Sequence, residues 1–74
     1  MRLREFLFHR GVRYTAISRQ TEVDGAKIWE PDLCAFVNGK RFQPSYPKRL
    51  RKALAALGMK EADLDTVDEF KPKA

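Results

Sequence analysis

The chain has 74 residues, a formal net charge of +5 and one cysteine, Cys34. This length limits it to one small domain. A lone cysteine excludes an internal disulfide, and His9 as the sole histidine leaves no zinc-type ligand set, so we expect no metal and no cofactor. No apolar run approaches the roughly 20 residues that span a bilayer, so we expect no membrane partner and a cytoplasmic location.

The charge is unevenly distributed along the chain. Residues 1–60 carry thirteen Lys or Arg and five Asp or Glu, a net of +8, whereas residues 61–74 carry two Lys and five acids, a net of −3. A body this basic favours a polyanionic partner, nucleic acid before a membrane surface. A solvated surface that is simply basic is the alternative.

Four helices with short connections are predicted, near residues 2–10, 14–21, 31–38 and 45–57. Their apolar residues recur at helical spacing, which places them on a buried stripe of each helix. These residues are Leu3, Phe6, Leu7, Ile17, Leu33, Phe36, Val37, Leu50, Ala53, Leu54 and Leu57. Gly11, Gly39 and Gly58 end three of the helices as left-handed stops. Pro31 suits a first helical turn, and Ser45 is a natural N-cap.

The segment from Asp24 to Pro31 joins the second and third predicted helices. Trp29 lies in this connector and off any helix stripe. Its ring either seals the edge of the helical bundle or projects towards a ligand. Cys34 lies beside the buried stripe of the third helix, and we expect it to be half-buried.

The end of the chain is predicted to differ from the rest. The segment from Glu61 to Leu64 predicts one further helical turn, so the domain is expected to cover residues 1–64. Residues 65–74 are polar and acidic, with only Val67 and Phe70 to bury. We therefore expect a flexible tail there.

Three blocks of sequence carry a family resemblance. Gly11 to Ser18 reads Gly-Val-Arg-Tyr-Thr-Ala-Ile-Ser, Leu33 to Arg41 reads Leu-Cys-Ala-Phe-Val-Asn-Gly-Lys-Arg, and Leu50 to Gly58 is a Leu-rich closing helix. Over residues 3–58 the chain resembles the Cro and lambda-repressor type of helix-turn-helix DNA-binding domain, the xenobiotic-response-element family. The resemblance implies an all-α, lambda-repressor-like bundle of four helices, or five with the C-terminal turn, whose second and third helices form the helix-turn-helix.

The chain departs from this family in the connector, which is longer than the family's tight turn. We leave open whether it contacts DNA or a protein. The third helix also begins with two acids, Glu30 and Asp32. Either carboxylate could accept a hydrogen bond from cytosine. The alternative is that both simply favour the positive end of a helix dipole.

The resemblance also implies which residues meet DNA, because a helix-turn-helix lays its second helix in the major groove while nearby side chains contact phosphates. The expected phosphate contacts are Arg13, Tyr14, Arg19, Lys40, Arg41, Lys48 and Arg49. The expected base-edge contacts are Lys27, Trp29, Asp32, Ala35 and Asn38. Among these, Ala35 could contact a thymine methyl group.

The predicted function is therefore a sequence-specific DNA-binding regulator of transcription, such as a small phage- or plasmid-derived repressor. Its expected partner is double-stranded DNA, bound by one copy or by a homodimer. No acid–base pair, nucleophile constellation or phosphate loop is evident, so we expect neither enzymatic activity nor a small-molecule substrate. The alternative is a protein-interaction module, such as an antirepressor or accessory factor, built on the same helices.

Overall fold

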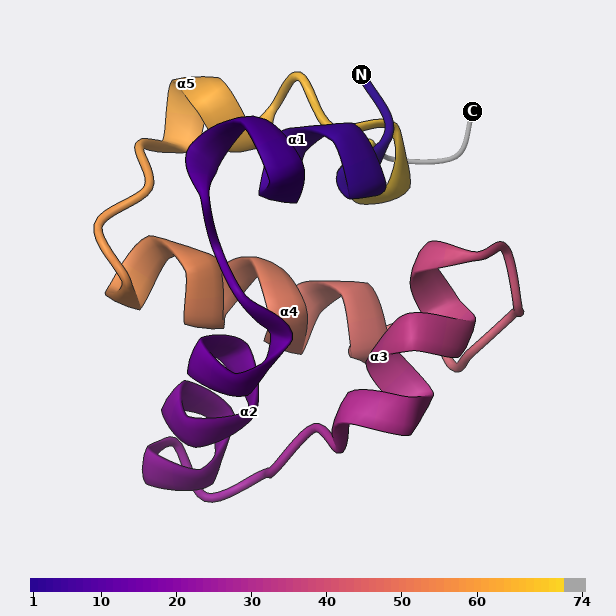
Figure 1. Ribbon diagram of the computed structural model, residues 1–74, viewed down its shortest axis with the longest axis vertical. Helices are drawn as coiled ribbons and strands as arrows, with labels where there is room; N and C mark the ends of the chain where they lie inside the picture. The colour runs from indigo at the N-terminus through magenta and orange to yellow at the C-terminus, as the bar shows by residue number, and fades with distance from the viewer. Residues whose placement is uncertain (72–74) are drawn as a thin grey trace.

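The computed structural model describes residues 1–71, and over these the chain is all-helical, with no strand. It contains five α-helices and one 3-10 helix: α1 (Leu3–Arg10), α2 (Tyr14–Val23), α3 (Glu30–Val37), α4 (Ser45–Ala56), α5 (Glu61–Leu64) and η1 (Asp68–Phe70). The all-helical class and the fifth short helix agree with the prediction. Figure 1 shows α4 across the middle of the molecule, with α1 and α5 on one side and α2 on the other. None of these helices is long and apolar enough to cross a membrane.

The core lies around α4, whose inner residues are fully buried because they repeat at helical spacing. The α2 helix packs on α4 and α3, and Ser18, at 6% exposure, is small enough to let the helices approach. Every predicted stripe contributes to the core. Its buried apolar residues are Leu3, Phe6, Leu7, Ile17, Ile28, Leu33, Val37, Tyr46, Leu50, Ala53, Leu54, Leu64 and Val67.

The end of α3 directs the chain into the following basic segment. Gly39 has a φ of 104°, in the left-handed region that favours glycine. This conformation lets the Lys40 N–H donate to the Ala35 carbonyl at 2.9 Å, which satisfies one of the last helical acceptors. Lys40 and Arg41 therefore leave α3 at a fixed point and remain exposed.

The connector between α2 and α3, residues 24–29, is fixed to the bundle by a buried hydrogen bond. Thr21 is 1% exposed, and its hydroxyl accepts from the Ile28 N–H at 2.8 Å. Ile28 is 2% exposed, whereas Trp29 is 59% exposed. The interpretation of Trp29 as a seal of the bundle is therefore wrong. Neighbouring side chains on extended backbone point in opposite directions, so the burial of Ile28 turns Trp29 outward.

The flexible tail expected from residue 65 is wrong for residues 65–71, which pack on the helices. Val67 is fully buried. The Glu69 carboxylate accepts hydrogen bonds from the Leu3 N–H at 3.0 and 3.1 Å. The first N–H groups of a helix have no partner within it, so Glu69 supplies one for α1. The domain therefore extends beyond residue 64, and positions 72–74 of the expected tail lie outside the described residues.

A smaller expectation concerns the start of α4. Ser45 is the first helical residue, and Pro44 occupies the cap position. Neither residue makes a side-chain capping hydrogen bond, so the prediction of Ser45 as an N-cap is wrong. Proline suits the beginning of a helix because its fixed φ is already helical and it has no N–H to satisfy.

Candidate nucleic-acid interface

The middle of the outer face of α3 is neutral and built from small or short side chains. Leu33 and Val37 point into the core, and helical rotation places Pro31, Ala35 and Asn38 on the opposite side. Cys34 and the exposed Asp32 lie at the two edges of this face. The Asn38 amide lies 3.4 Å from the Cys34 Sγ. Cys34 is exposed, against the expectation of half-burial, because it lies one helical step beyond the buried stripe.

The two acids at the start of α3 lie on the flanks of this face. The Glu30 carboxylate accepts a hydrogen bond from the Thr15 hydroxyl at 3.2 Å. Thr15 is in the first turn of α2, so this bond joins the N-terminal ends of α2 and α3. Asp32 lies on the side of α3 that faces Tyr46 of α4. The pKa of Tyr46 is raised to about 12, mainly by burial and secondly by the negative charge of Asp32. Neither carboxylate occupies the middle of the face.

One group of predicted phosphate contacts surrounds the start of α2. Arg13 is the residue before α2, Tyr14 is its first residue and is half-buried, and Arg19 is exposed one turn further on. Arg13 and Arg19 line the same hollow, together with Leu57 and other residues. This hollow faces the end of α4 and includes no residue of α3, and Tyr14 lines a separate hollow with Arg4.

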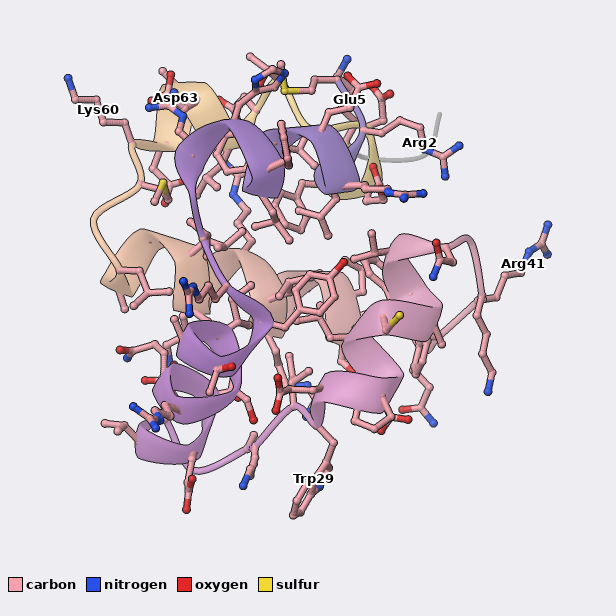
Figure 2. The ribbon with its side chains drawn as sticks, viewed as in Figure 1. Arg2, Glu5, Trp29, Arg41, Lys60 and Asp63 are labelled. Atoms are coloured by element: carbon pink, nitrogen blue, oxygen red, sulfur yellow. The ribbon has the colours of Figure 1, made fainter. Side chains whose placement is uncertain are left out.

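A second group follows the end of α3. Lys40, Arg41 and Lys48 line one groove between the α3–α4 connection and α4. The Arg49 guanidinium lies 5.6 Å from the centre of the Tyr46 ring, next to this group. Figure 2 shows Arg41 extending away from the bundle into solvent.

Two cations that the sequence interpretation did not select lie at the same end of α3. Arg2 and Arg4 share a hollow with Val37 and Asn38. In Figure 2, Arg2 and Arg41 extend on the same side of the molecule. The contact joins residues more than thirty positions apart in the chain, so no local pattern reveals it. The only signal in the sequence is that both arginines lie off the apolar stripe of α1.

Lys27 and Trp29 lie together near the N-terminal end of α3. The Lys27 Nζ is 4.1 Å from the centre of the Trp29 ring and 3.6 Å from a Glu22 carboxylate oxygen. A cation over an indole face is a favourable contact. Figure 2 shows Trp29 extending from the bundle beyond the start of α3, so the ring is accessible there.

Most of the lysines and arginines in the described part of the chain are outside ion-pair distance of a carboxylate. Among residues 1–71 the lysines and arginines within ion-pair distance of a carboxylate are Arg10, Lys27, Arg51 and Lys71. All six cationic phosphate candidates are outside that set, as are Arg2, Arg4, Lys52 and Lys60. Their positive charge is therefore not neutralised by a neighbouring acid in the described part of the chain.

Comparisons of the chain with protein-family models, with curated proteins and with solved structures gave no match. The case for a function therefore depends on the geometry and the charge of the residues themselves.

Proposed function

We propose that this chain is a helix-turn-helix DNA-binding domain of the lambda-repressor-like class, and that it regulates transcription by binding specific duplex sequences. One observation carries the proposal: the neutral middle of the outer face of α3 lies near cations at the C-terminal end of this helix that have no acidic partner within residues 1–71. A helix enters the major groove, which is roughly 12 Å wide, when its outer side chains are short and its flanks attract phosphates.

In this proposal α3 supplies the base contacts. The Asn38 side-chain amide can donate one hydrogen bond to an adenine edge and accept one from it, and Ala35 can contact a thymine methyl group. Cys34 and Pro31 are small enough to let the helix approach the bases. Trp29 and Lys27 extend the contact beyond the start of α3, where the connector is longer than a tight turn.

The phosphate contacts come from two sides of α3. Arg13, Tyr14 and Arg19 contact the backbone near the start of α2, which the Thr15–Glu30 bond joins to α3. Lys40 and Arg41 contact it beyond the end of α3, with Lys48 and Arg49 further along. Such contacts position the domain, whereas base contacts select the sequence.

The decisive experiment is a titration of fluorescein-labelled random duplex DNA at several salt concentrations, followed by anisotropy. The logarithm of the binding constant should fall linearly with the logarithm of salt, by about 0.9 per phosphate neutralised. The double variant Lys40→Ala, Arg41→Ala should reduce this slope by about two units.

Lys60→Ala is the matched control. Lys60 is exposed, has no acidic partner in the described part of the chain and lies far from Arg41 in Figure 2, so its removal should leave the slope unchanged. An absence of binding at low salt would overturn the proposal. An equal loss of slope in the double variant and in Lys60→Ala would show that DNA binds the basic surface without a preference for Lys40 and Arg41.

Sequence preference needs a second measurement, because random DNA reports only the phosphate contacts. A selection from a random duplex library should yield a consensus. Asn38→Ala should then relax the preference at one base pair, by about 1–3 kcal/mol of discrimination. A library that returns no consensus would limit the domain to non-specific binding.

A protein-interaction module remains the second candidate, and the exposed Trp29 ring favours it. Tryptophan is enriched at the centres of protein interfaces, and the ring is 59% exposed beside Glu30. This candidate predicts no salt-dependent DNA binding, together with a Trp29→Ala variant that folds normally but loses a protein partner.

A further inference from the structure

A groove with a volume of about 560 Å³ lies between the α3–α4 connection, α4 and η1. Its apolar lining includes Phe36, Phe42 and Phe70, together with Pro44 and Pro47. The three phenylalanine rings are half-buried, so each rests on the core and still presents a surface to the groove. A volume of this size is typical of small-molecule sites, which span roughly 300–1,000 Å³.

The aromatic wall of this groove is held in place by ring contacts. Phe42 stacks on Tyr46, with ring centres 4.3 Å apart and planes 23° from parallel. Phe36 contacts Phe42 edge to face at 5.8 Å. Tyr46 itself is 5% exposed and belongs to the core. The wall is therefore preformed, and an apolar ligand would not need to order it.

The rim of the groove is cationic and only partly neutralised. Lys40, Arg41 and Lys48 have no acidic partner within residues 1–71, whereas two further lining cations are paired with nearby carboxylates. The acid among the lining residues, Glu69, accepts both of its hydrogen bonds from the Leu3 N–H. Glu69 keeps its negative charge, but cations outnumber it in the lining, and a hollow with apolar walls and an excess of positive charge attracts anions.

We propose that this groove binds a small amphiphilic anion, namely an aromatic or aliphatic carboxylate. The apolar body lies against Phe42 and Phe70, and the carboxylate pairs with Lys48 and Lys40. A free inorganic anion leaves the apolar walls uncovered, and a neutral apolar molecule leaves the lysines unpaired. A ligand with both parts uses both features of the groove.

Binding of this anion has a consequence for the DNA contacts. Lys40 and Arg41 line the groove and are also proposed phosphate contacts, so a bound anion competes with DNA for their charge. This coupling rests on the proposed function, whereas the anion site itself does not.

The site is tested with a pair of fluorescent probes that share one aromatic body. The anion 1-anilinonaphthalene-8-sulfonate carries a negative charge, and N-phenyl-1-naphthylamine is its uncharged counterpart. The folded protein should bind one equivalent of the anion, about fivefold or more tightly than the neutral probe, as one partly exposed ion pair allows. Backbone amide shifts should change around Lys40, Phe42 and Phe70.

Lys48→Gln should weaken binding of the anionic probe about fivefold and leave binding of the neutral probe unchanged. Lys60→Gln is the matched control, because it removes the same charge at a distant site, and it should change neither. Circular dichroism establishes that both variants are folded. Equal affinity for the two probes, equal effects of the two variants, or amide shifts centred on the exposed Phe8 would overturn the proposed site.

The coupling is tested separately. Saturation with the anionic probe should lower the affinity for duplex DNA severalfold, and the neutral probe should not. Anion binding without any DNA binding would overturn the proposed function and leave the site intact. DNA binding that the anion does not affect would overturn the coupling alone.

Discussion

At the C-terminal cap, residues 61–71, carboxylates pair with cations from other parts of the chain, whereas the cations around the C-terminal end of α3 have no such partner within residues 1–71. In the cap, Asp63 lies 3.0 Å from Arg10, and Glu61 lies 2.6 Å from Arg51. Both regions are rich in charge and both are exposed. They differ in whether that charge is satisfied inside the molecule.

The difference separates two uses of surface charge. A cation already paired with a carboxylate must lose that partner before it can bind a phosphate. A cation without a neighbour is solvated and available, at the cost of repelling the others around it. The unpaired cations near the C-terminal end of α3 are therefore the basis of the proposal that an external anion binds there.

The largest expected effect concerns how the cap is held. Leu64 is fully buried, so Leu64→Ala should lower the free energy of unfolding by about 2–5 kcal/mol, because a cavity replaces lost packing. The neighbouring change Asp63→Asn breaks the pair with Arg10, and should cost under about 1 kcal/mol because both side chains are partly exposed. Urea denaturation measures both, and equal losses would show that the ion pairs hold the cap.

The next effect compares two arginines on one helix. Arg4 has no acidic partner and lies near Asn38, whereas Arg10 pairs with Asp63. Arg4→Ala should reduce the salt slope of DNA binding by about one unit, and Arg10→Ala should leave it unchanged. An equal salt slope for Arg4→Ala and Arg10→Ala would show that pairing with a carboxylate does not decide which arginines contact phosphate.

A smaller effect uses Cys34, the single cysteine of the chain, as a reporter of the outer face of α3. Duplex DNA should slow the reaction of this thiol with 5,5′-dithiobis(2-nitrobenzoate) severalfold, because the helix is covered when it lies in the groove. The reaction rate is followed by absorbance, with unfolded protein as the control for direct effects of DNA on the reagent. An unchanged rate would place DNA on another face.

The smallest effect concerns Tyr46, whose buried hydroxyl has no hydrogen-bond partner within residues 1–71. Burial raises its pKa to about 12, so the folded state retains a proton that the unfolded state loses near pH 10. The associated stability is complete below about pH 10 and is lost as the pH rises towards 12. Tyr46→Phe should remove this alkaline loss and change stability at pH 7 by under about 1 kcal/mol, because it deletes an unpaired group.

Measurement of unfolding in urea between neutral and alkaline pH checks this prediction. A large loss of stability for Tyr46→Phe at pH 7 would show that the hydroxyl has a partner. An alkaline loss that persists in the variant would assign it to other groups.

Most of the helical architecture could be predicted, because its causes are local. The apolar stripe of α3 and the left-handed Gly39 follow from residues within one or two turns. The candidate site was predictable only in part. Ala35 and Asn38 lie on the outer face of α3, as the resemblance implies, but Arg2 and Arg4 reach it from the other end of the chain.

The errors have the same origin. Trp29 was a candidate seal of the bundle by size alone, and only the contact between Ile28 and Thr21 determines which of the two neighbours is buried. Residues 65–71 were predicted to be a flexible tail because they are polar and have only Val67 and Phe70 to bury. The segment packs because Val67 is buried in the core and Glu69 accepts from the Leu3 N–H at the start of α1.

The sequence by itself determined the order and approximate extent of the helices and that the body is basic, since spacing, glycine conformation and charge are properties of short segments or of composition. The tertiary structure alone decided which charges are neutralised, which face of α3 is open and where the apolar walls meet the cationic rim. These depend on residues far apart in the chain, and their distances are fixed only when the core has packed.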